Sequence, residues 1–105
     1  NSASAFQELR RPAIEIAFRN GQQLHAEQVT RFTLFVFRRL APADLPLQQE
    51  SLAVLQQYDH RNWNDVLEFP SVENICELLA RQLKGRLRFP FVIRVHEGHG
   101  KWAEM

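Results

Sequence analysis

The chain has 105 residues, which suits one domain, and its 13 basic and 12 acidic side chains nearly cancel. Nucleic-acid binding needs a clustered excess of positive charge, so this balance gives no support for a nucleic-acid partner. The single cysteine, Cys76, excludes an internal disulfide. No apolar run is long enough to cross a membrane, and the first residues do not resemble a signal peptide. We therefore expect a cytoplasmic protein with one domain over residues 1–105, of which residues 1–11 form a flexible end.

Two segments in the first part of the chain predict antiparallel strands. Residues 14–18 carry apolar side chains at every second position, as in a half-buried strand, and Asn20-Gly21 then favours a tight turn. Residues 29–37 predict a second strand with apolar side chains on both faces: Phe32, Leu34 and Val36 on one, and Phe35 and Phe37 on the other. Because apolar groups on both faces need cover on both, we expect a homo-oligomer.

Two helices and a strand pair follow. Residues 41–46 predict a linker and residues 47–58 a helix. A second helix is predicted from Ser71, a favourable N-cap, towards Gly85, with its apolar residues on one face: Val72, Ile75, Cys76, Leu79 and Leu83. Residues 89–96 predict a third strand, and residues 101–105 a short fourth. The expected class is α+β, an antiparallel sheet with two helices packed on one face.

Three motifs occur in order from residue 59 onward. Residues 59–65 are Asp-His-Arg-Asn-Trp-Asn-Asp, residues 70–75 are Pro-Ser-Val-Glu-Asn-Ile, and residues 93–97 are Ile-Arg-Val-His-Glu. In this order and at this spacing, they resemble the LDHxxLND, P-T-x-E-N-[IL]-A and V-x-V-x-E motifs of the 6-pyruvoyl-tetrahydropterin synthase and 6-carboxytetrahydropterin synthase family.

The resemblance implies the tunnelling fold (T-fold), in which several subunits form a β-barrel with pterin pockets at their interfaces. In that family a glutamate holds the amino-pyrimidine edge of the pterin through paired hydrogen bonds, a role that matches Glu97 here. Glu73, in the second motif, is a further candidate for ligand binding. An aspartate–histidine pair transfers protons in the family's lyase reaction, a role that matches Asp59 and His60.

The N-terminal half departs from the family at the zinc site. The family binds zinc through three histidines and uses a cysteine as a base. Where its L-H-G-H would fall, this chain has Leu24-His25-Ala26-Glu27, and Gly21 replaces the cysteine. His25 and Glu27 would share one face of an extended strand, but two ligands fall short of the usual three. We therefore expect no metal cofactor, with His25 and Glu27 as the remaining candidate zinc ligands.

Three functions stay open. The first is an enzyme that binds a pterin or purine-like heterocycle at a subunit interface, with acid–base catalysis by Asp59 and His60 and no zinc. A related metal-free reaction, similar to that of dihydroneopterin aldolase, would use Lys101 near Glu97. The second is a non-catalytic T-fold module for binding or assembly. The third is the synthase with altered zinc ligands, against which Gly21 and Glu27 argue.

Each candidate residue also has a structural interpretation. Asp59 and His60 could cap the backbone amides of residues 62–65 at a helix end. Glu97 could be a solvated carboxylate at the end of a strand. The tertiary structure has to decide which neighbours these side chains have.

Overall fold

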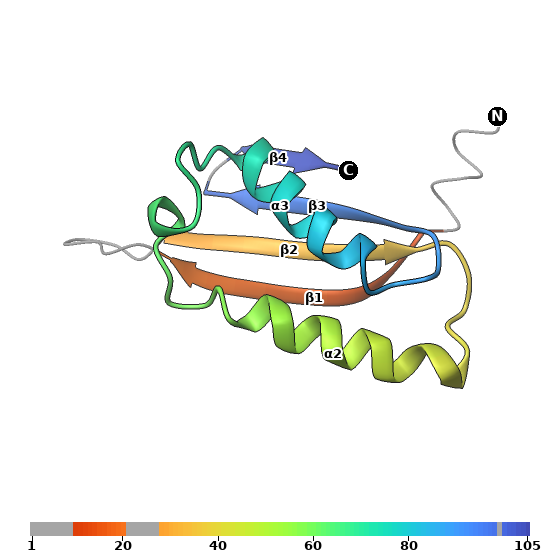
Figure 1. Cartoon of the computed structure of the whole chain (residues 1–105). Helices are drawn as coiled ribbons and strands as arrows, with labels where there is room; N and C mark the ends of the chain where they lie inside the picture. The colour runs from red at the N-terminus through yellow and green to blue at the C-terminus, as the bar shows by residue number, and fades with distance from the viewer. Residues whose placement is uncertain (1–9, 21–27, 99) are drawn as a thin grey trace, which may run out of the picture.

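The computed structural model describes residues 10–20, 28–98 and 100–105. In these residues the chain forms a four-stranded antiparallel sheet in the order β1-β2-β3-β4, with helices α2 and α3 packed on it (Figure 1). The strands are β1 (Arg11–Asn20), β2 (Gln28–Val36), β3 (Phe91–Glu97) and β4 (Lys101–Glu104). The helices are η1 (Pro42–Asp44), α2 (Leu45–Gln56), η2 (Trp63–Asp65) and α3 (Val72–Lys84). The predicted α+β class is confirmed.

One face of the sheet is apolar because side chains alternate along each strand. In β1, Ile14 and Phe18 are buried, while Glu15 between them is exposed. The register places Leu34 of β2 between Ile14 of β1 and Ile93 of β3, and these three side chains are buried together. Apolar side chains from neighbouring strands therefore form one continuous layer, which the helices cover.

Helix α3 covers this layer with the predicted apolar stripe. The hydroxyl oxygen of Ser71 accepts a hydrogen bond from the backbone N–H of Asn74 at 3.2 Å, so Ser71 is the N-cap as predicted. The stripe residues are all buried: Val72, Ile75, Cys76, Leu79 and Leu83. Burial raises the pKa of the Cys76 thiol to about 11, so this side chain is a neutral core residue.

Several boundaries differ from those expected, and three of them affect the interpretation of the sequence. The predicted linker at 41–46 is partly helical, since η1 forms there and α2 begins at Leu45 with Pro46 in its first turn, where a missing N–H costs no hydrogen bond. Strand β3 begins at Phe91 rather than at residue 89, because Pro90 cannot donate to a strand ladder. Strand β1 begins at Arg11, inside the segment expected to be a flexible end.

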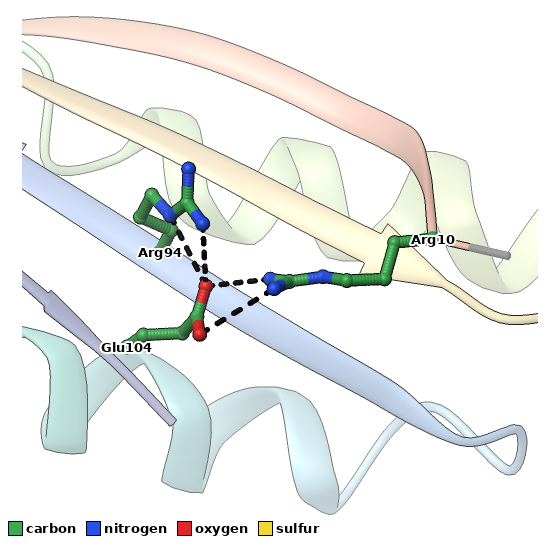
Figure 2. Close-up of polar contacts among 3 residues, drawn as sticks. All are labelled: Arg10, Arg94 and Glu104. Carbon is green, nitrogen blue, oxygen red and sulfur yellow. Dashed lines mark hydrogen bonds and ion pairs between the residues drawn. The ribbon is translucent and has the colours of Figure 1, made fainter. Parts of the chain in front are cut away.

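The second face of the sheet is less apolar than the sequence suggested. The Phe35 ring lies on it, and its centroid is 4.2 Å from the guanidinium carbon of Arg10 and 5.2 Å from that of Arg94. Both guanidiniums bind the carboxylate of Glu104 (Figure 2). Cation–π contacts from the same chain therefore cover part of Phe35. The inference that this face needs a neighbouring subunit is weaker than the sequence alone implied.

No helix in the described parts of the chain is long and apolar enough to cross a membrane.

Candidate functional site

A cavity of about 520 Å³ lies between the start of α3 and the hairpin that joins β3 to β4. Its lining residues come from those two elements and from the segment before α3: Pro70, Ser71, Val72, Glu73, Glu97, Gly100, Lys101 and Trp102. In Figure 1 the first turn of α3 lies beside the β3–β4 hairpin. Small-molecule sites typically have volumes of roughly 300–1,000 Å³, so the cavity has room for a heterocycle. The structure thus brings Glu73 and Glu97, the two predicted ligand-binding residues, into one cavity.

Glu97 and Lys101 form one wall of this cavity. They are directly opposite each other in the β3–β4 pairing, so their side chains point to the same face of the sheet. Gly98 and Gly100 in the connection have φ values of 62° and 77°, a region that suits glycine because a Cβ would be strained there. The hairpin therefore places an acidic and a basic residue on the same face of the sheet at the cavity.

Buried aromatic side chains lie at Thr30, the residue of β2 that pairs with Glu97. Thr30 of β2 pairs with Glu97, and its hydroxyl oxygen accepts a hydrogen bond from the indole N–H of Trp63 at 3.0 Å. The Trp63 ring stacks on Tyr58, with 5.3 Å between centroids, and meets Phe18 edge-on. Because Trp63 is only 5% exposed, it belongs to the core and offers no surface on which a ligand could stack.

The second motif builds the opposite wall. The side-chain N–H₂ of Asn74 donates to the backbone carbonyl of Phe69 at 2.7 Å, while its backbone N–H donates to Ser71. These two bonds fix the turn that leads into α3. Glu73 then lies in the first turn, where the partial positive charge of a helix N-terminus favours a carboxylate.

Asp59 and His60 lie elsewhere, at the outer edge of β1. The Asp59 carboxylate accepts the backbone N–H of Arg19 at 2.8 Å, and the backbone N–H of His60 donates to the carbonyl of Arg19 at 2.6 Å. The hydrogen bond from Arg19 holds the pKa of Asp59 below its usual value of 3.8. The expected capping of residues 62–65 by this pair is not observed, because Asn62 itself accepts the N–H of Asn64.

The imidazole of His60 is available to solvent. Its Nδ1 lies 3.2 Å from the Asp59 carboxylate, and its side chain is 72% exposed. In the described residues His60 is the one non-glycine residue with a positive φ, at 64°. Such backbone conformations cost energy in most residues and occur often at functional sites. The pair therefore combines a structural bond to β1 with an exposed imidazole.

The cavity and the Asp59–His60 pair lie at the same end of the sheet but at opposite edges. Arg19 pairs with Val29, and the next residue, Thr30, pairs with Glu97. Strands β1 and β4 are the two edges, with β2 and β3 between them. Neighbouring strands are about 4.8 Å apart, so three such steps separate the edges by roughly 14 Å. Asp59 and His60 accordingly do not line the cavity of their own chain.

The candidate zinc ligands His25 and Glu27 lie outside the described residues. Within residues 10–20, 28–98 and 100–105, no group of three or more His, Cys, Asp or Glu side chains is arranged to hold a metal ion. No chemical step is therefore assigned to zinc.

An antiparallel four-stranded sheet, two helices and a glutamate-lined cavity at a strand end are consistent with a domain of the T-fold type. The family model for 6-pyruvoyl tetrahydropterin synthase matches residues 45–105, which is more than half of the chain, and the chain belongs to this family. No curated protein matched the sequence. The matched region contains Asp59, His60, Glu73 and Glu97. It begins at residue 45, after β1, β2 and the candidate zinc ligands, so the match does not include them.

Proposed function

We propose that this protein binds a pterin or a purine-like heterocycle in the cavity between α3 and the β3–β4 hairpin. The observation that carries the proposal is the position of Glu97, the last residue of β3, in the wall of the cavity. Pterins and guanine present an N–H and an NH₂ side by side. A carboxylate has two acceptor oxygens at matching separation, and such charge-assisted pairs are short and strong.

The proposal also places the site between subunits of a homo-oligomer. Strands β1 and β4 run in opposite directions and both are edges, so β1 of one copy can pair with β4 of the next and continue the antiparallel sheet. This arrangement would bring Asp59 and His60 of one copy to the end of the sheet where Glu97 and Lys101 of the other lie. The site would then be complete only in the assembly.

In the assembled site, Glu97 would orient the ligand and His60 would transfer a proton to or from it. A histidine suits this role because its ordinary pKa lies close to neutral pH. Asp59 would position the imidazole through its contact with Nδ1. Such proton transfer is the chemistry of a lyase related to 6-pyruvoyl-tetrahydropterin synthase, carried out here without an assigned metal.

A second candidate function is a binding module without catalysis. It is favoured by the hydrogen bonds of Asp59 and His60 to Arg19. These bonds give the pair a structural role, because they satisfy backbone groups at the outer edge of β1. Ligand binding without turnover in the purified protein would support this second candidate over the enzyme.

Calorimetric titration with neopterin, biopterin and guanine tests the binding proposal. We expect Glu97→Gln to weaken binding by about 2–4 kcal/mol, because the amide replaces one acceptor by a donor that faces the ligand's own donor. Glu50→Gln, an exposed change on α2, is the matched control and should leave affinity unchanged. Equal affinity in wild type and Glu97→Gln would contradict the proposal. A monomer in light scattering at micromolar concentration would contradict the subunit interface.

A further inference from the structure

The pairing of Glu97 with Lys101 suggests a specificity that goes beyond heterocycle binding. The two residues are cross-strand partners on the same face and both line the cavity. Directly opposed residues in an antiparallel pair have Cβ atoms about 4.5–5.5 Å apart, so their charged groups can lie side by side. The wall therefore offers two acceptor oxygens followed by a positively charged donor.

This order of groups matches one kind of heterocycle edge. A 2-amino-4-oxopyrimidine ring, as in pterin and guanine, presents an NH₂ donor, an N–H donor and a carbonyl acceptor in a row. Glu97 can accept the two donors, and the Lys101 ammonium can donate to the carbonyl oxygen. A 2,4-dioxo ring offers Glu97 only one donor, and a 2,4-diamino ring places a donor opposite Lys101.

We propose that Lys101 is a specificity-determining residue that recognises the ring carbonyl beside the N–H held by Glu97. The inference rests on the proposed heterocycle site and assigns the ligand class as 2-amino-4-oxo rings. The ammonium also offsets part of the negative charge of Glu97 and Glu73 in the cavity. Because Lys101 and Glu97 are cross-strand partners, one ligand edge can meet both groups.

A comparison of guanine with 6-thioguanine tests the contact between Lys101 and the ring carbonyl. In 6-thioguanine, sulfur replaces only the carbonyl oxygen, while the two donors that Glu97 binds remain. Sulfur is a weak acceptor of hydrogen bonds. A hydrogen bond to a charged group contributes enough free energy to change the affinity about tenfold. We expect wild type to prefer guanine by about this ratio in titrations followed by tryptophan fluorescence. Lys101→Met should reduce the ratio to about 1–3, and Lys101→Arg should retain part of it.

Lys84→Met is the matched control, since Lys84 is the other lysine of the chain and lies exposed at the far end of α3. It should leave the ratio unchanged, and thermal unfolding should show that all variants fold, as Lys101 is exposed. If Lys101→Met leaves the ratio of the two affinities unchanged, this inference is overturned, whether or not both affinities fall by the same factor. If Glu97→Gln still weakens both ligands in that case, the proposed function survives. If Glu97→Gln weakens neither, both the site and this inference fail.

Discussion

The guanidinium of Arg10 lies 2.5 Å from the carboxylate of Glu104, although 94 positions separate the two residues. Arg10 directly precedes β1, and Glu104 ends β4, so the contact crosses the sheet face above β2 and β3 (Figure 2). Arg94 of β3 binds the same carboxylate, with nitrogen–oxygen distances of 3.0 and 3.1 Å. One carboxylate thus links the two edges of the sheet on the face away from the helices.

We expect Glu104→Gln to lower the free energy of unfolding by about 1–2 kcal/mol, because one carboxylate serves two guanidiniums. The hydrogen bonds from Arg10 and then Arg94 hold the pKa of Glu104 below its usual value of 4.5. A carboxyl whose pKa is lower in the folded state stabilises the protein above the unfolded pKa, and this contribution is lost as the pH falls through the folded pKa. The difference between wild type and variant should therefore be constant near neutral pH and shrink below about pH 4.5.

Urea denaturation at a series of pH values measures this difference. Glu77→Gln is the control, because Glu77 pairs with Arg81 one turn away on the exposed face of α3. Such helix pairs contribute about 0.3–0.5 kcal/mol. Equal losses in the two variants would show that the contact between Arg10 and Glu104 has no special role in linking the sheet edges.

Trp63→Phe should lower the free energy of unfolding by about 1–3 kcal/mol, because the hydroxyl of buried Thr30 loses its indole donor and the smaller ring leaves space in the core. Trp102→Phe is the comparison, since Trp102 is 54% exposed. A change at such a surface position should stay within about 0.5 kcal/mol. Chemical denaturation of both variants checks the contrast, and similar losses would argue against a stabilising role of the bond between Trp63 and Thr30.

Asp59→Ala should expose the backbone N–H of Arg19 to solvent, since the carboxylate is the acceptor of that group. Amide hydrogen exchange followed by NMR should show faster exchange at Arg19. In wild type, this stabilising bond requires the ionised carboxylate, so it is present above the ordinary pKa of 3.8 and lost as the pH falls through the lower folded value.

Asp65→Ala in η2 is the control for the Asp59 variant, because it removes a carboxylate from the same loop without touching β1. Protection at Arg19 should persist in that variant. If the amide of Arg19 exchanges at the same rate in wild type and Asp59→Ala, Asp59 does not protect this N–H at the edge of β1.

Purified protein should contain far less than one zinc per chain. Only His25 corresponds to one of the three imidazoles in the family's zinc site, and a zinc site needs at least three protein ligands. Elemental analysis of protein prepared without chelator measures the content. A value near one zinc per chain would revive the synthase with altered ligands, and His25→Ala would then be the variant in which to look for its loss.

Helix α3 and the apolar face of the sheet could be predicted from the sequence because their signals are local. The Ser71 cap depends on residues within one turn, and the stripe from Val72 to Leu83 follows from the helical period alone. The pairing of β2 with both β1 and β3 is not local. Neither is the placement of Arg10 over Phe35, which explains why the sequence overstated how apolar the second face is.

The sequence by itself determined which side chains face the core and which residues match the family motifs, since periodicity and motif spacing are properties of short segments. Only the tertiary structure decided that Glu73 and Glu97 share a cavity while Asp59 and His60 lie at the other edge of the sheet. The hydrophobic pattern predicts which side chains of a strand face the core, but it does not predict which strands pair with each other. Strand order and register arise from hydrogen bonds between distant segments, and these bonds place the two groups of candidate residues at opposite edges of the sheet.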